Sequence, residues 1–210
     1  YWSGKSNRER IMKAMTTNWQ AAYGAGMFTE FQEQRAPGHT VLGYKMFNTG
    51  FLQLKKEIKD SLDKLDYFTD PEAYAKSEEL EAMNICCDAI MMYANRHAEK
   101  LERLCDTETD PKRKKELKNM AAVCRRVPAH TPETVNEMLQ HYWFIHLGVV
   151  TELNPWDSFN PGRLDQHLSP VYKEQLDAGK ISKEDAYDLL CCFWVKFNNH
   201  PAPPKVGVTA

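Results

Sequence analysis

The sequence lacks the motifs of several common protein classes. It has no CxxC pair, no HxxxH or HExxH motif, and no phosphate-binding loop, dinucleotide fingerprint or GxSxG elbow. No apolar run approaches the ~20 residues that a membrane-crossing helix needs. With 27 basic and 29 acidic residues, the formal charge is only -2, so no strong field attracts nucleic acid or an anionic membrane. The sequence therefore excludes a transmembrane protein, disfavours nucleic-acid binding, and gives no support to nucleotide-binding or serine-hydrolase interpretations.

The cysteines favour a reducing compartment. Two adjacent pairs and two single residues make up the set: Cys86, Cys87, Cys105, Cys124, Cys191 and Cys192. This spacing fits neither a zinc ribbon nor a small disulfide framework, so we expect a cytoplasmic protein with free thiols. Consecutive helical residues point about 100° apart and cannot bind one metal ion from one face. We therefore predict that the adjacent pairs pack in the core.

Apolar residues recur at helical spacing along most of the chain, which predicts roughly 60–70% helix against a base rate of about a third. The predicted helices cover about residues 6–19, 47–65, 70–105, 110–124, 131–150, 164–168, 170–178 and 182–197. Their starts carry Ser, Asp or Thr as capping residues, often followed by Pro or Glu. Residues 23–42 are expected to be irregular, and residues 206–210 have the alternation of a strand. No solenoid repeat or low-complexity stretch is present.

Two charged or titratable features have simple structural interpretations. His141 and His146 are five residues apart on a predicted helix, and we expect His146 to be a hydrogen-bonded core residue rather than a metal ligand. The basic run 112–115 is balanced by acids on both sides, so we predict a solvated helix face.

One irregular segment stands apart, the run 152–163 between two predicted helices. It contains Trp156 with two acids, amides and an arginine. One interpretation is a loop in which Asp157 or Asn160 caps a helix or turn. The other is a pocket wall, in which the indole supplies apolar surface beside polar anchors.

Three longer strings resemble one enzyme family. They are Cys124-Arg125-Arg126-Val127-Pro128-Ala129-His130-Thr131-Pro132-Glu133, then Gln140-His141-Tyr142-Trp143-Phe144-Ile145-His146-Leu147, then Asn160-Pro161-Gly162-Arg163-Leu164-Asp165-Gln166-His167-Leu168. Their order, together with Gly38-His39-Thr40, is similar to glycyl radical enzymes of the pyruvate formate-lyase superfamily. The resemblance implies a mainly α segment of a ten-stranded β/α barrel, with outer helices and one or two short strands. Residues 1–210 would be a partial domain, truncated at both ends.

The resemblance also implies which parts of the chemistry this segment lacks. None of the six cysteines lies in the Gly-Cys-x-Glu context of the family's thiyl residue, and the radical glycine motif is absent. We therefore assign no catalytic residue, no metal ligand and no bound cofactor to the segment, which alone should be inactive. Its parent would carry a post-translational glycyl radical, installed by an S-adenosylmethionine-dependent activating enzyme. A homodimer and a small-molecule substrate are expected.

Within the superfamily, the run 154–160 looks most like the branch of isethionate sulfite-lyase. That resemblance implies radical cleavage of a C–S bond in a small sulfonate, converting isethionate to acetaldehyde and sulfite, with Trp156, Asp157 and Ser158 binding the substrate. Choline trimethylamine-lyase, glycerol or diol dehydratases and arylacetate decarboxylases share the scaffold and stay open as alternatives. A rival from another class is a helical scaffold domain without chemistry of its own.

Overall fold

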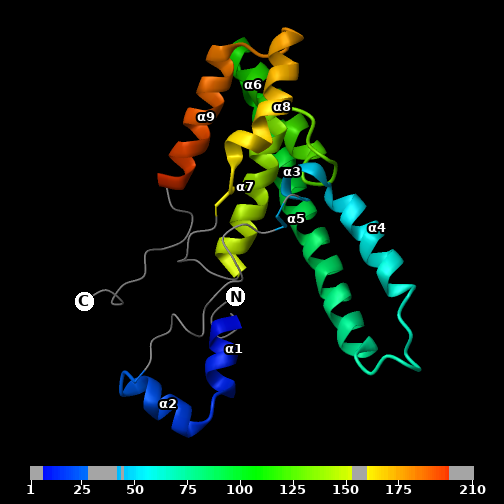
Figure 1. Cartoon of the computed structure of the whole chain (residues 1–210). Helices are drawn as coiled ribbons and strands as arrows, with labels where there is room; N and C mark the ends of the chain where they lie inside the picture. Colours follow the sequence, from blue (N-terminus) through cyan, green and yellow to red (C-terminus); the bar gives the residue numbers. More distant parts are fainter. Residues whose placement is uncertain (1–6, 28–41, 44, 153–159, 199–210) are drawn as a thin grey trace. The chain divides into compact units, whose positions relative to one another are not determined.

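The computed structural model describes residues 7–27, 42–43, 45–152 and 160–198, and every regular element in these ranges is a helix (Figure 1). In chain order they are α1 (Asn7–Ala14), α2 (Thr17–Gly24), α3 (Lys45–Asn48), α4 (Phe51–Leu62), α5 (Ala73–Thr107), α6 (Pro111–Arg126), α7 (Val135–Glu152), α8 (Leu164–Asp177) and α9 (Lys183–Asn198). The predicted strand at 206–210 lies outside the described residues. Among the described helices, none combines the length and the apolar character needed to cross a lipid bilayer.

The chain divides into two compact units. The larger unit comprises residues 42–145 and 163–193, and the smaller comprises 1–41, 146–162 and 194–210. The larger unit therefore holds α3 to α6, the first part of α7, α8 and most of α9. It also contains most of the buried apolar side chains.

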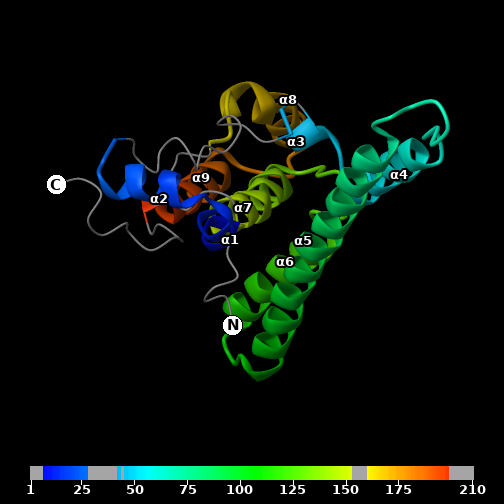
Figure 2. The same cartoon turned by 90° about the horizontal axis from the view of Figure 1, so that it is seen from below.

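The antiparallel pair of α5 and α6 is the backbone of the larger unit, and the two helices lie side by side in both views (Figures 1 and 2). Their shared core consists of small residues with one aromatic ring from α7, and two partly buried residues pack against it: Ala94, Ala98, Cys124 and Phe144, with Ile90 and Leu101. Small side chains allow the two helix axes to approach closely. At the exposed edge of this interface, Arg125 donates two hydrogen bonds to the Glu102 carboxylate, from Nε to Oε1 at 3.0 Å and from Nη2 to Oε2 at 2.8 Å.

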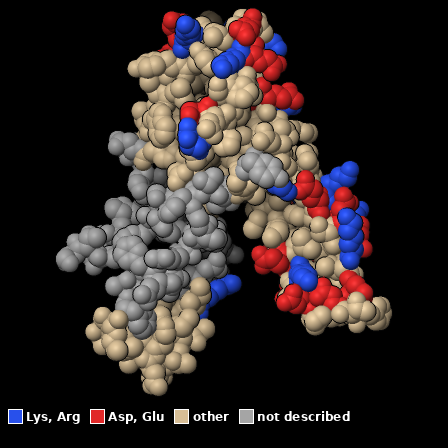
Figure 3. All heavy atoms as spheres, viewed as in Figure 1, with Lys and Arg blue, Asp and Glu red and all other residues tan. Residues whose placement is uncertain are grey.

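Helix α4 packs against α5, and its buried residues are Phe51 and Ile58. On the outside, Lys55 Nζ contacts Asp88 Oδ1 at 2.5 Å. Acidic and basic side chains are interspersed over α4 and the turn that leads to α5 (Figure 3). Lys56, Lys59 and Asp60 of this helix are exposed.

An aromatic cluster joins α3, α7, α8 and α9 within the larger unit. Tyr142 has no exposed surface, and its ring centroid lies 6.3 Å from that of Phe47 and 5.6 Å from that of Phe193. Phe47 also contacts the His167 ring at 4.8 Å, and Phe193 contacts Trp143 at 6.3 Å. Such pairs add to the energy of apolar burial. Burial raises the pKa of Tyr142 well above its usual range, so its hydroxyl stays protonated.

Two of the predicted helix starts are confirmed in detail. The Asp110 carboxylate accepts hydrogen bonds from the N–H groups of Lys112 and Arg113 at 3.1 and 3.4 Å, and α6 begins at the following proline. Before α9, Ser182 Oγ accepts from the Asp185 N–H at 2.9 Å, and the Asp185 carboxylate accepts from the Ser182 N–H at 3.2 Å. These reciprocal bonds satisfy N–H groups that a helix N-terminus leaves free.

Two predicted helices are each divided in the structure. The first, predicted over 6–19, stops at Ala14, because Thr16 adopts an extended backbone and its Oγ1 accepts from the Trp19 N–H at 3.2 Å. This local cap starts α2 instead. The second, predicted over 47–65, is divided between α3 and α4 at Gly50, whose backbone is also extended.

The opposite correction applies to α8. The two short helices predicted at 164–168 and 170–178 form one continuous helix that contains Pro170. A proline inside a helix removes one backbone hydrogen bond. The helix nevertheless buries Leu164 and Leu168 before the proline and half-buries Leu176 after it, so packing keeps one axis.

Helices α5 and α7 begin a few residues later than predicted. Asp70 accepts from the Glu72 N–H at 2.9 Å and so caps a turn, and α5 starts at Ala73. For α7, Thr134 Oγ1 accepts from the Glu137 N–H at 3.1 Å. The Val135 N–H donates to Gln175 Oε1 of α8 at 2.9 Å, so a side chain 40 residues away completes the first turn.

The start of α4 is bonded to the 128–131 segment that follows α6. The Phe51 N–H donates to the Pro128 carbonyl at 2.9 Å, and the Leu52 N–H donates to the Ala129 carbonyl at 3.0 Å. These are two of the four N–H groups that have no acceptor within their own helix. Two carbonyl groups thus take the place of the side-chain cap that α4 lacks.

Gly50 allows these two backbones to meet. Its N–H donates to Thr131 Oγ1 at 3.2 Å. A β-carbon at this position would lie 2.5 Å from the carbonyl carbon of His130 and 2.6 Å from the carbonyl oxygen of Ala129. Because both are backbone atoms, rotation of a side chain cannot relieve the overlap.

We expect Gly50→Ala to lower the free energy of unfolding by about 1–3 kcal/mol, the usual cost of overpacking. Gly24→Ala is the matched control, since no heavy atom lies within 4 Å of the added β-carbon, and it should be neutral or slightly stabilising. Urea denaturation of the full chain measures both. Equal midpoints for the two variants would contradict the close approach at Gly50.

Candidate functional site

The predicted pocket residues Trp156, Asp157 and Ser158 lie outside the described residues, so their role in substrate binding stays a prediction. The motif 38–40 lies outside them too. The structure describes the helices on both sides of the loop: α7 ends at residue 152 and α8 starts at residue 164.

At the C-terminal end of this loop, local contacts set the path of the chain. Asn160 Oδ1 accepts from the Gly162 N–H at 2.8 Å, and Gly162 has a positive φ of 64° that favours glycine. This contact agrees with the interpretation in which Asn160 caps a turn, while the pocket-wall interpretation concerns residues outside the described ranges. At the start of α8, the Arg163 guanidinium contacts both Asp165 oxygens at 3.1 and 3.0 Å, and this hydrogen bonding lowers the pKa of the Asp165 carboxyl.

The first family-like string contains a charged cluster around Arg126, which reaches Glu137 in the first turn of α7. Its Nη2 donates to the Thr131 carbonyl at 3.2 Å and contacts Glu133 Oε1 at 2.5 Å. Its Nε lies 3.3 Å from Glu137 Oε1, and only 12% of the Glu137 side chain is exposed. The second Glu137 oxygen accepts from the Glu133 N–H at 2.8 Å. This cluster ties the 128–131 segment to the start of α7.

Sequence reasoning placed Arg126 in a family-like string but did not find the partners of its guanidinium. A signal was available, because Thr134 and Glu137 have the Ser/Thr-x-x-Glu spacing of a capping box. The prediction placed the helix start at Thr131 instead, since the Thr-Pro-Glu run resembles the Asp-Pro starts elsewhere in the chain.

His141 is the most unusual titratable group of the described region. It has no exposed surface, its ring lies 6.0 Å from that of Phe51, and neither ring nitrogen has a hydrogen-bond partner in the part of the chain that the structure describes. Burial lowers the pKa of His141 to about 4, so the ring is neutral at pH 7. His146, predicted to be a core residue, is indeed buried and contacts the Phe197 ring at 5.1 Å.

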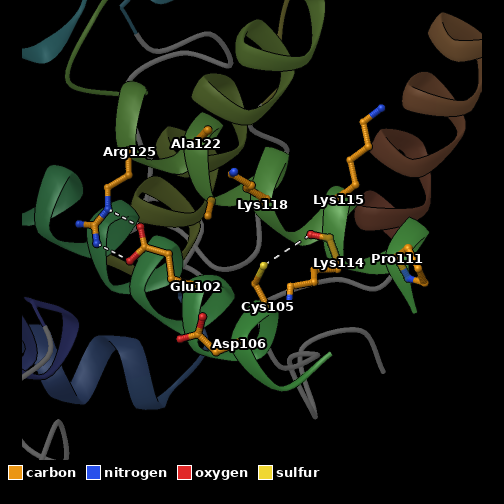
Figure 4. Close-up of a pocket in the computed structure, with 10 residues that line it drawn as sticks. Glu102, Cys105, Asp106, Pro111, Lys114, Lys115, Lys118, Ala122 and Arg125 are labelled. Carbon is orange, nitrogen blue, oxygen red and sulfur yellow. Dashed lines mark hydrogen bonds and ion pairs between the residues drawn. The ribbon is translucent and has the colours of Figure 1, made fainter. Parts of the chain in front are cut away.

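An open groove runs along the end of the α5–α6 pair (Figure 4). It is lined by Glu102, Cys105, Asp106, Pro111, Lys114, Lys115, Lys118, Ala121, Ala122 and Arg125. The charged residues here include both signs, and Arg125 is already paired with Glu102 at 2.8 Å. The Cys105 thiol donates to the Lys114 carbonyl at 3.6 Å. The basic run 112–115 is exposed, as predicted.

The prediction for the adjacent cysteines is only partly correct. All six thiols are free, and Cys87 is buried, which raises its pKa. Its neighbour Cys86 is exposed, as are Cys191 and Cys192. For the first pair the reason is the helical rotation of about 100° per residue, which turns Cys86 away when Cys87 faces the core. In the second pair, α9 faces the core through Phe193 instead.

Among the side chains that the structure describes, no group of three or more His, Cys, Asp or Glu is placed to hold a metal ion. Around the family-like strings, the contacts that the structure describes are paired charges, backbone hydrogen bonds and contacts between rings.

The whole chain, residues 1–210, matches the family model described as pyruvate formate lyase-like. The chain belongs to this family, in agreement with the resemblance of its motifs.

Within the family, the chain is 53% identical over 209 residues to trans-4-hydroxy-L-proline dehydratase of Clostridioides difficile, which is 100% of this chain and 26% of that protein. It is 32% identical over 204 residues to isethionate sulfite-lyase of Nitratidesulfovibrio vulgaris, covering 93% of this chain and 25% of that one. The branch suggested by residues 154–160 is thus a relative at lower identity.

Solved structures agree. The crystal structure of hydroxyproline dehydratase from Clostridioides difficile matches with a TM-score of 0.85, over 99% of this chain and 26% of that one. Glycerol dehydratase from Clostridium butyricum matches at 31% identity and a TM-score of 0.79, over 98% of this chain and 26% of that one. The helical architecture is therefore the expected outer segment of a barrel enzyme, and the chain spans about a quarter of the length of these relatives.

Burial of the unpaired His141 ring predicts a pH-dependent stability. The unfolded chain binds a proton at the ordinary pKa of about 6.5, whereas the folded chain does so only near pH 4. The free energy of unfolding should therefore fall by about 3 kcal/mol as the pH drops from 7 to 4.

This contribution is isolated by comparing wild type with His141→Leu, which should lose that part of the pH dependence in urea denaturation between pH 4 and 7. His130→Leu, at an exposed histidine, is the control and should retain the wild-type slope. An unchanged slope in His141→Leu would show that the ring finds a partner in solution.

Proposed function

We propose that this chain is part of a glycyl radical dehydratase, which removes water from a small hydroxylated substrate. The observation that carries the proposal is the 53% identity to trans-4-hydroxy-L-proline dehydratase over 100% of the chain. The matched stretch includes both the helices and the candidate pocket loop, so trans-4-hydroxy-L-proline is the first substrate to test. A 29% match to (2S)-3-sulfopropanediol dehydratase, again over 100% of the chain, supports the same reaction class.

In this proposal the segment encloses and orients the substrate. Trp156 supplies an apolar wall, and Asp157 and Ser158 supply polar contacts to the hydroxyl or charged groups of the substrate. The cluster at Arg126 and the helices α7 and α8 hold the two ends of the loop. A packed enclosure serves this chemistry, because a radical must be kept from water and oxygen.

The reacting groups themselves would lie elsewhere in the parent, since this chain has neither the Gly-Cys-x-Glu string nor the radical glycine motif. When present, the radical supplies hydrogen abstraction from a substrate carbon, which allows the neighbouring leaving group to depart before the hydrogen returns. The segment alone is proposed to be inactive.

A second candidate is cleavage of a C–S bond in isethionate. It is favoured by the 32% identity to isethionate sulfite-lyase and by the similarity of residues 154–160 to that branch. The glycerol-type and diol-type dehydratases are included in the main proposal, while a helical scaffold without chemistry is the alternative outside the enzyme class.

The proposed partners follow from the family. They are a small-molecule substrate, an S-adenosylmethionine-dependent activating enzyme, and a second copy of the chain in a homodimer. The proposed location is the cytoplasm, which suits the six free thiols.

The first experiment is anaerobic activation of the full-length parent by its activating enzyme, followed by electron paramagnetic resonance and two assays. We expect a glycyl doublet and loss of water from trans-4-hydroxy-L-proline. A doublet with sulfite release from isethionate instead would select the second candidate. The absence of a doublet with a competent activating enzyme would favour the scaffold interpretation.

Trp156 tests the pocket assignment. In the full-length enzyme, Trp156→Ala should lower kcat/KM by more than tenfold with little effect on stability, because it removes a contact to the substrate rather than a core contact. Trp156→Phe should retain most of the activity.

Phe68→Ala is the control, since this ring is fully exposed on the turn between α4 and α5, and it should behave as wild type. An unchanged kcat/KM in Trp156→Ala would remove this residue from the pocket.

A further inference from the structure

His141 is buried where α7 meets the first turn of α4. Its ring has no exposed surface, and the ring centroid lies 6.0 Å from that of Phe51, the first residue of α4, with 50° between the ring planes. Neither ring nitrogen has a hydrogen-bond partner among the described residues. Because the ring is already enclosed within this chain, contacts from further parts of a longer protein would be made to the residues around it rather than to the imidazole.

Among the described residues of its own helix, no charged group is placed to compensate a proton on this ring. Glu137 is one turn away, but its two carboxylate oxygens contact the Arg126 guanidinium and the Glu133 N–H, at 3.3 and 2.8 Å. The hydroxyl of Tyr142 stays protonated. Burial alone lowers the pKa of His141, and no neighbouring charge contributes.

The charged and titratable groups on the elements around the ring are engaged elsewhere or exposed. His130, on the 128–131 segment, is exposed, and His167 of α8 contacts the Phe47 ring. Those on α3 and α4 form ion pairs or are exposed: Lys45 with Glu57, Lys55 with Asp88, and the exposed Lys56, Lys59 and Asp60. The positive end of the α4 dipole, at Phe51, also disfavours a cation here. A protonated His141 would therefore be an unpaired buried charge, which is strongly unfavourable.

The start of α4 is the part of this junction that can release. It has no side-chain cap, and the N–H groups of Phe51 and Leu52 hold it by their bonds to the carbonyls of Pro128 and Ala129, at 2.9 and 3.0 Å. Phe51 thus supplies both the first of these bonds and the ring beside His141. A movement that lets water reach the imidazole past the Phe51 ring therefore also breaks the bond to Pro128.

From this geometry we infer that His141 is an acid-sensitive switch: when its imidazole takes up a proton, the start of α4 leaves the 128–131 segment while the α5–α6 pair stays folded. The proton comes from solvent and stays on the ring, and hydration of the imidazolium in the open form drives the change. At neutral pH the uncharged ring packs against Phe51, and the junction stays closed. The switch is a local opening of one junction, distinct from unfolding of the chain.

Hydrogen exchange of the full-length protein between pH 7 and pH 5 tests the switch. After correction for the pH dependence of the chemical exchange rate, protection of the Phe51 and Leu52 N–H groups should fall by roughly tenfold or more. The reason is that the open form binds a proton that the closed form excludes. Protection of the amides within α5 and α6 should change by less than about twofold over the same range.

Two variants that cannot titrate remove the switch. His141→Leu and His141→Phe place an apolar side chain in an apolar site, so both should fold, and protection at the start of α4 should no longer depend on pH in this range. Far-UV circular dichroism and thermal unfolding check the fold of each. His130→Leu is the matched control, because this exposed histidine lies on the 128–131 segment itself. It should keep the wild-type pH dependence.

Four outcomes would overturn the inference. One is unchanged protection of Phe51 and Leu52 between pH 7 and pH 5. A second is an equal loss of protection in α5 and α6, which would mean that the chain unfolds as a whole. The third is a wild-type pH dependence in His141→Leu or His141→Phe, and the fourth is a failure of both variants to fold, which would show that the ring is paired. None of these depends on the glycyl doublet, so a failure here leaves the proposed function to its own test.

Discussion

The contact between the start of α4 and the 128–131 segment organises the larger unit. It is a backbone-to-backbone contact, in which the N–H groups of Phe51 and Leu52 meet the carbonyls of Pro128 and Ala129. Only a residue without a β-carbon at position 50 allows it. This contact joins α4 to the segment that follows α6. The cluster at Arg126 then joins the end of α6 to the start of α7. The aromatic cluster around Tyr142 then fills the space between the helices.

Helical periodicity predicted the existence and type of the long helices, because an apolar stripe and a local cap are both visible in the sequence. Asp110 and Ser182 are caps of this kind. The boundaries that failed depend on partners distant in the chain. Residue 50 interrupts a periodic run because of residues 128–131, and α7 starts at Val135 because Gln175 of α8 supplies its acceptor. In α8, tertiary packing overrode the proline that local rules treat as a break.

For the site, the family could be inferred from three short strings, and the comparisons agree. The preference for one branch could not, because it rested on residues 154–160 alone, whereas over the whole chain the identity is 53% to a hydroxyproline dehydratase and 32% to isethionate sulfite-lyase. The burial of His141 without a hydrogen-bond partner among the described residues could not be predicted from the sequence either. An isolated histidine on an apolar helix face carries no local sign of whether its nitrogens find partners. That depends on rings such as Phe51, 90 residues earlier in the sequence.

The bond from Gly50 to Thr131 spans 81 residues, and this has a consequence for how the chain reaches its fold. During synthesis, the first turn of α4 emerges long before its acceptors exist. Its N–H groups must stay hydrated until α5 and α6 have formed and returned the chain to the same place. Closing so long a loop costs entropy before any contact compensates for it. Formation of the α5–α6 hairpin, whose contacts are local, is therefore the natural early event, and bonding of the first turn of α4 to the 128–131 segment is a late one.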